Sequence, residues 1–144
     1  MAEENDSWVR RRFDCEEIIR SLTWADISVA LSNALEDFVN IYENQYGEER
    51  RQVLNHGPGD GYSYRAAITK GLEKKVSNLD VTYALTKTGG AHVDVEWRGD
   101  WEMPKQRFDV CCADGEVVIT NKAGVAISPA HVSKEILEDA LFGS

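Results

Sequence analysis

A helical period of apolar residues marks the stretch between Trp24 and Tyr46. Thr23 is placed to cap the start of this stretch and Gly47 to end it. We therefore predict one long helix that buries one face against the rest of the molecule. The apolar positions at alternating spacings of three and four are Trp24, Ile27, Leu31, Ala34, Phe38 and Ile41.

Residues 1–12 are polar and include a run of arginines. We predict that they form a flexible tail, followed by a single domain over residues 13–144. Asp14 and Glu17 have capping-box spacing, which predicts that a short helix begins there.

Residues 47–64 have a less regular pattern. Residues 52–54 predict a further helical turn, and residues 56–64, rich in glycine, predict a loop. Over 65–78 the apolar spacing fits a second helix, weakened at Gly71 because glycine is a poor helix former.

From Leu79 onward apolar and polar residues alternate, which is typical of strands. Four groups, at 79–85, 91–97, 108–112 and 117–119, predict an antiparallel meander, and residues 125–127 add a short fifth strand. Ser128 and Pro129 are typical of a helix start and precede a C-terminal apolar stripe.

The residues in the turns predict which positions of neighbouring strands lie opposite each other. The Asp114-Gly115 turn places Cys112 opposite Val117. Pairing Trp97 with Phe108 keeps apolar residues on one face, and it places Glu96 opposite Asp109. At Gly89-Gly90 a two-residue turn would oppose Leu85 to Asp94, so we expect a three-residue loop or a glycine bulge.

Together these elements predict an α+β fold in two layers. A four- to five-stranded antiparallel meander is covered on one face by the long N-terminal helix and the C-terminal helix.

Composition narrows the function classes. The 144 residues include 16 Lys+Arg against 25 Asp+Glu, a net charge of −9, which disfavours nucleic acid as a partner and favours a basic protein. The positive charge is concentrated over residues 50–78, with 6 basic and 2 acidic side chains. No apolar run is long enough for a membrane span, and the polar N-terminus lacks the pattern of a secretory signal.

The 3 cysteines are an odd number without framework spacing, so we expect a reducing compartment and a cytoplasmic location. Cys111 and Cys112 are neighbours on a predicted strand and face opposite ways. We expect Cys112 to be a small core residue.

The glycine-rich segment is one candidate ligand site. Glycines let a backbone approach a ligand, and exposed backbone N–H groups can hold an anion. The alternative is that the segment only connects two helices. The candidate ligand-binding residues are His56, Asp60, Tyr62, Tyr64, Arg65 and Lys70.

The outer face of the meander is a second candidate. Asp94, Glu96 and Asp109 share it and form either a solvated charge lattice, a partner surface or the metal site of a nuclease. In the loop that follows, Trp101, Glu102 and Met103 resemble recognition anchors, although Trp101 and Met103 are equally suited to fold back over the core edge.

No nucleophile, base and orienting group come together in the sequence, and no cofactor or resident metal is predicted. The leading hypothesis is a small acidic non-enzymatic binding protein, such as an inhibitor, an immunity protein or a chaperone-like adaptor. One alternative is a small-anion or nucleotide-binding protein that uses the glycine-rich loop 56–65, either as a ligand-sequestering protein or as a modest hydrolase. The other is a metal-dependent nuclease. The edge of the first strand offers a surface for a homodimer.

Overall fold

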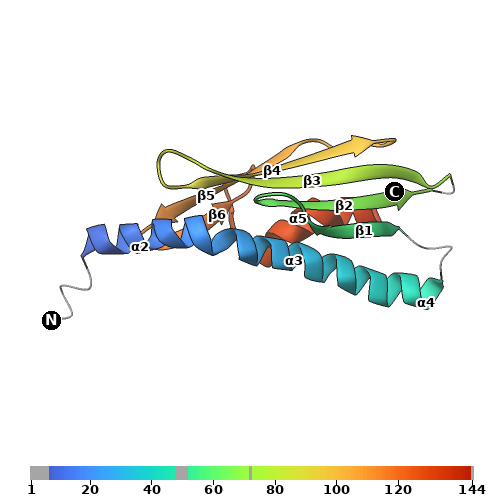
Figure 1. Ribbon diagram of the computed structural model, residues 1–144, viewed down its shortest axis with the longest axis horizontal. Helices are drawn as coiled ribbons and strands as arrows, with labels where there is room; N and C mark the ends of the chain where they lie inside the picture. The colour runs from blue at the N-terminus through green and yellow to red at the C-terminus, as the bar shows by residue number, and fades with distance from the viewer. Residues whose placement is uncertain (1–6, 48–51, 72, 144) are drawn as a thin grey trace.

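The alternating half of the sequence folds as an antiparallel sheet, and the helical stripes cover one of its faces (Figure 1). The computed structural model describes residues 7–47, 52–71 and 73–143. The predicted α+β class is confirmed. The helices are α2 (Trp8–Ser21), α3 (Thr23–Phe38), the π-helical turn η1 (Val39–Glu43), α4 (Asn44–Tyr46) and α5 (Pro129–Phe142).

Within the described residues the sheet has seven strands in sequence order, each antiparallel to the next. The prediction of four to five strands is therefore too low. The strands are β1 (Val53–Pro58), β2 (Ser63–Lys70), β3 (Lys75–Leu85), β4 (Ala91–Gly99), β5 (Gln106–Ala113), β6 (Glu116–Thr120) and β7 (Ala126–Ile127).

The two extra strands come from residues 52–78, where the predicted helical turn and helix are wrong. The loop predicted over 56–64 is confirmed only over 59–62, which form the turn of a hairpin. Strand β2 is buried on both faces, because Ala66 and Ile68 face the core while Ala67 and Thr69 on the opposite face are also covered. A strand buried on both sides loses the polar alternation that identifies it. Gly71, with φ +77°, lies in the turn between β2 and β3 instead of inside a helix.

The meander that follows is close to the prediction. Cys112 lies opposite Val117, and the β3–β4 hairpin closes through a hydrogen bond from the Thr86 N–H to the Gly90 carbonyl, around a three-residue loop. Both features confirm the predictions. The short strand β7 is also confirmed.

The predicted register between β4 and β5 is wrong. Phe108 lies opposite Val93, not Trp97, so Asp109 faces His92 and not Glu96. The loop before β5 is long because it is tied to the start of β3, where the Val76 N–H donates to the Asp100 carboxylate at 3.1 Å. The shift preserves parity, so each side chain keeps its predicted face.

The N-terminal helices differ from the prediction at their ends. Helix α2 begins at Trp8, before the expected capping box, so residues 8–12 of the predicted flexible tail are helical. Residues 1–6 lie outside the described residues, and the division into a tail and one domain stays a prediction. Thr23 does not cap α3; its hydroxyl donates to the Ile18 carbonyl at 3.2 Å.

The long predicted helix is continuous to Tyr46, but its last part is the π turn η1. A π turn inserts one residue into the helical repeat and rotates the side chains that follow. Ile41, predicted to lie on the buried stripe, is therefore 56% exposed, and Glu43 is buried instead.

Helices α3 and α5 run parallel over the inner face of the sheet. Thr23 and Ser128, at their starts, line one cavity, and their ends meet where Phe38 contacts Phe142. The start of α5 confirms the prediction, because Ser128 accepts a hydrogen bond from the His131 N–H and Pro129 is the first helical residue.

A disulfide joins Cys15 of α2 to Cys112 of β5, with Cα atoms 6.1 Å apart. Cys112 packs against the core as expected, but its bond to Cys15 was not anticipated. Cys111 is free and exposed. This disulfide argues against the expected reducing compartment, because such bonds are rare where thiols are kept reduced. The cytoplasmic location stays an untested prediction. None of the helices in the described residues is long and apolar enough to span a membrane.

Candidate interaction surface

The structure places the glycine-rich segment in the β1–β2 hairpin, not between helices. The Gly59 N–H donates to the Ser63 carbonyl at 3.1 Å, and the Ser63 hydroxyl donates to the Asp60 carbonyl at 2.8 Å. The hairpin therefore satisfies part of its own backbone. Gly61 has φ +65°, a conformation that glycine adopts without strain.

The candidate ligand residues on this hairpin do not converge. His56 Nδ1 and the Tyr64 hydroxyl are 2.6 Å apart, and Tyr64 is buried. Tyr62 packs edge-on against Tyr83. Burial is the main cause that raises the pKa of Tyr64; a hydrogen bond with the Ser32 side chain acts to lower it, and the Glu36 carboxylate adds to the rise.

The two candidate cations lie apart from that pair. Arg65 has its Nε 3.9 Å from the Asp80 carboxylate on the outer sheet face. Lys70, at the other end of β2, has its Nζ 4.4 Å from the centre of the Trp101 ring. The segment thus brings together only His56 and Tyr64 of the predicted set.

On the outer face of the sheet, each predicted carboxylate has a basic neighbour. Arg107 Nε lies 2.6 Å from Asp94, and Lys105 Nζ lies 3.3 Å from Glu96. His92 Nδ1 lies 2.8 Å from Asp109. This arrangement is the charge lattice that the sequence offered as one alternative.

Neighbouring charges shift the pKa values of two of these groups. The Arg98 guanidinium, followed by the Lys105 ammonium, lowers the pKa of Glu96. The Asp94 carboxylate raises the pKa of Arg107. A polar cavity of about 400 Å³ lies over this lattice. In the described part of the chain, no three His, Cys, Asp or Glu side chains gather in a way that could hold a metal ion.

The loop after β4 folds back onto the molecule. The Trp101 ring lies 5.1 Å from the Trp97 ring, and its Nε1 donates to the Lys75 carbonyl at 3.0 Å. Met103 also packs against the core, while Glu102 between them is exposed. Trp101 and Met103 therefore cover the edge of the core.

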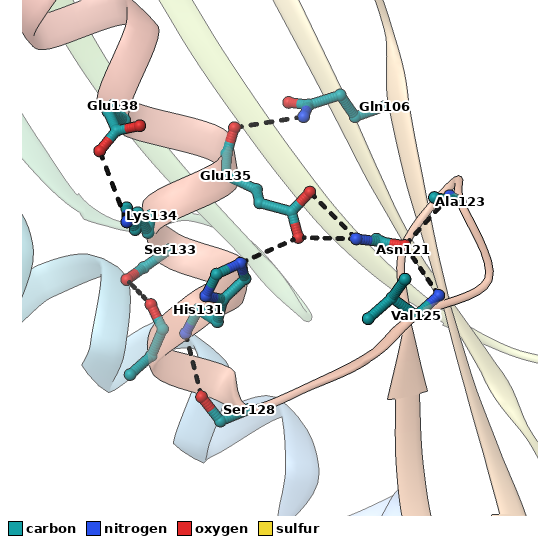
Figure 2. Close-up of polar contacts among 11 residues, drawn as sticks. Gln106, Asn121, Ala123, Val125, Ser128, His131, Ser133, Lys134, Glu135 and Glu138 are labelled. Atoms are coloured by element: carbon teal, nitrogen blue, oxygen red, sulfur yellow. Dashed lines mark hydrogen bonds and ion pairs between the residues drawn. The ribbon is translucent and has the colours of Figure 1, made fainter.

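A cluster of polar side chains connects the first turns of α5 to the turn before β7 (Figure 2). Glu135 receives two hydrogen bonds from the Asn121 side chain and lies 3.6 Å from His131. The Asn121 side-chain oxygen Oδ1 in turn accepts hydrogen bonds from the Ala123 and Val125 N–H groups. Because Glu135 ties the turn before β7 to the helix, we interpret this cluster as structural.

Tyr83 gives the clearest prediction of pH dependence. Its hydroxyl donates to the Ile19 carbonyl at 2.6 Å, and burial raises its pKa to about 12. The unfolded chain, with an ordinary tyrosine pKa near 10, loses this proton first, so rising pH favours unfolding between pH 10 and 12.

We expect this group to remove about 1.4 kcal/mol of stability per pH unit in that window, with its contribution intact below pH 10. Urea unfolding at several pH values should show a shallower alkaline loss for Tyr83→Phe than for wild type. The exposed Tyr46→Phe is the control, and equal slopes for wild type and Tyr83→Phe would contradict the assignment.

The surface that sequence reasoning missed is a groove between the two parallel helices. Its volume is about 290 Å³, and its lining is almost entirely apolar. Phe38, Ile41 and Tyr42 form one wall, and Leu137 and Leu141 belong to the other.

Aromatic side chains gather where this groove reaches the ends of the helices. Tyr42 contacts Phe38 at 5.0 Å and Phe142 at 5.3 Å between ring centres. Tyr46 is 56% and Phe142 57% exposed. Exposed aromatic residues that cluster beside an apolar groove are typical of a recognition surface.

The same end of the molecule is acidic. Residues 23–46 contain no Lys or Arg, and Glu36 and Asp37 lie in the last turn of α3. Asp37 lines the groove on one side and Glu138 on the other, and Glu138 is 3.8 Å from Lys134. Helix α5 has Glu138 and Asp139 near its C-terminal end and no basic residue in its last turn. The dipole of α5 adds negative potential at this end, where the Lys70 Nζ donates to the Asp139 carbonyl at 3.4 Å.

Part of this surface could be found from the sequence and part could not. Two features of the sequence indicate part of this surface: residues 23–46 contain no Lys or Arg, and Phe142 is a large aromatic residue near the end of the C-terminal apolar stripe. The exposure of Ile41 follows from the π turn, which no periodicity predicts.

Comparison of the chain with protein-family models, curated proteins and solved structures found no match, so its function is inferred from its own geometry.

Proposed function

We propose that this chain is a protein-binding module that takes a basic partner on the face formed by α3, η1 and α5. The observation that carries the proposal is the exposed aromatic cluster of Tyr42, Tyr46 and Phe142 beside a groove with Asp37 and Glu138 on opposite sides. This keeps the hypothesis of an acidic binding protein but moves the contact surface from the sheet to the helices.

The two features of this surface have separate roles in binding. Large aromatic side chains that become desolvated supply most of the affinity of an interface. Carboxylates around them steer a basic partner and reject acidic ones, with an effect that falls at high salt. On the outer sheet face, Asp94 and Glu96 lie closer to a basic side chain, at 2.6 Å from Arg107 and 3.3 Å from Lys105, than Glu138 of the groove does to Lys134 at 3.8 Å. Asp109 is hydrogen-bonded to His92.

The alternative functions have less support. An anion site on the β1–β2 hairpin would need His56, Arg65 and Lys70 to converge, and they lie apart. A nuclease centre on Asp94, Glu96 and Asp109 would need carboxylates free to bind a metal ion. We therefore retain the protein-binding function.

Affinity capture from the cells that make the protein, with charge-reversed variants, tests the proposal. Wild type should retain a basic protein at low salt and release it as salt rises. Asp37→Lys with Glu138→Lys should weaken capture roughly 10- to 100-fold, because two rim attractions become repulsions.

Glu102→Lys, on the loop after β4, is the matched control and should capture the partner normally. Equal capture by wild type and the double variant would contradict the proposed face. Loss of capture with Glu102→Lys alone would place the contact on that loop instead.

A further inference from the structure

We infer that the segment of the partner that enters the groove is a single amphipathic helix, flanked by basic residues on both sides of its apolar stripe. This inference rests on the proposed function and names the form of its ligand. It follows from the spacing of the side chains in the groove walls, from the charges beside them, and from the lack of regular backbone for strand pairing at the sheet edges.

The spacing of the walls fits a helix. Ala34, Phe38 and Tyr42 succeed one another at intervals of four, and Lys134, Leu137 and Leu141 face them at intervals of three and four. Each wall therefore repeats once per helical turn over two turns, roughly 11 Å. A helix laid between two parallel helices presents side chains at the same interval, because ridges of one helix fit grooves of the others. A strand, with its repeat of two, does not match this spacing.

The charges fix the composition of the occupant. Asp37 belongs to the α3 wall, and Glu138, which lies 3.8 Å from Lys134, belongs to the α5 wall, so one carboxylate borders each side of whatever lies in the groove. An occupant therefore needs Lys or Arg on both flanks of its apolar stripe. A second copy of this chain would oppose the same carboxylates to each other, which disfavours a homodimer through this face.

The sheet edges are poorly suited to the other common mode of peptide binding, strand addition. Strand β1 has a register shift between Val53 and Asn55 and ends at Pro58, which cannot donate a backbone hydrogen bond. At the other edge, β7 is only 2 residues long. A partner strand would thus find little regular backbone with which to pair.

The test uses two synthetic peptides of about 18 residues and identical Leu and Lys composition. In one peptide Leu recurs at i, i+3, i+4 and i+7 with Lys on both flanks, and in the other the order is scrambled. Each is titrated into the isotopically labelled full chain, with amide shifts followed by NMR and peptide helicity by circular dichroism.

We expect the amphipathic peptide to bind at least 10-fold more tightly than the scrambled one, to gain helicity, and to shift amides in α3, η1 and α5. Phe142→Ala should weaken its binding at least 10-fold. Val29→Ala is the matched control, because Val29 is an exposed apolar residue of α3 outside the groove lining.

Equal binding of the two peptides, shifts confined to other elements, or normal binding by Phe142→Ala would overturn the inference. Self-association of the chain that Phe142→Ala abolishes would assign the groove to a second copy. If cellular capture depends on Asp37 and Glu138 but the helical peptide does not bind, the proposed function stands and its helical ligand is wrong.

Discussion

Reduction of the disulfide between Cys15 and Cys112 should lower the free energy of unfolding by about 4 kcal/mol and the Tm by roughly 10 °C. The bond joins residues 97 positions apart, so it removes a large closure entropy from the unfolded chain. It also fastens α2, whose buried residues are only Cys15 and Ile19. The disulfide therefore adds a covalent link to the hydrogen bonds that the Arg11 guanidinium and the Tyr83 hydroxyl donate between this helix and the sheet.

Calorimetry with and without a dithiol reductant measures this difference, and thiol titration should count one reactive cysteine before reduction and three after unfolding in reductant. Cys15→Ser should reproduce the reduced stability without reductant. Cys111→Ser is the control, because Cys111 is free and exposed, and it should melt within about 1 °C of wild type. Insensitivity of the wild-type Tm to reductant would show that the bond does not form in solution.

The sequence-based predictions were accurate where the pattern of residues reports burial directly, and wrong where it does not. The strands β3 to β6 have one solvated face, so alternation identified them and turn parity placed Cys112 opposite Val117. Strand β2 has two covered faces and was mistaken for a helix. The register between β4 and β5 depends on where Asp100 and Trp101 are anchored, and those are long-range contacts that no local pattern contains.

The candidate site was harder to predict for a related reason. Composition predicted an acidic interaction surface but did not locate one. The exposed carboxylates of the sheet face were easy to find, and the structure pairs them with basic side chains. The groove depends on the parallel packing of α3 with α5 and on the rotation of Ile41 and Tyr42 by the π turn, and both arise only in the folded chain.

The groove region departs from what local stability favours. Negative side chains near the C-terminal end of α5 oppose its dipole, and Phe142 and Tyr46 expose apolar area to water. Departures of this kind are expected at sites kept for function, since a folded core gains nothing from them. A basic amphipathic partner would relieve both at once, by neutralising the carboxylates and covering the rings.

Glu43→Ala should destabilise the fold by about 3 kcal/mol, although Glu43 lies in no predicted site. The π turn directs its carboxylate to the start of β1, where one oxygen accepts hydrogen bonds from the N–H groups of Gln52 at 2.6 Å and Val53 at 3.1 Å. Removing a charged acceptor leaves two covered donors unsatisfied, and each such loss costs about 1–3 kcal/mol.

Glu43→Gln keeps an oxygen that can accept both bonds and loses only the charge, so its expected cost is about half that of Glu43→Ala. Urea denaturation gives both values, and amide exchange should quicken first in β1, because this carboxylate links that strand to the end of the helix. Glu36 is an exposed residue of the same continuous helix, so Glu36→Ala should change the free energy of unfolding by less than about 0.5 kcal/mol. If Glu43→Ala lowered the free energy of unfolding no more than Glu36→Ala does, the π turn would have no part in docking β1. The exposure of Ile41 would then need another explanation.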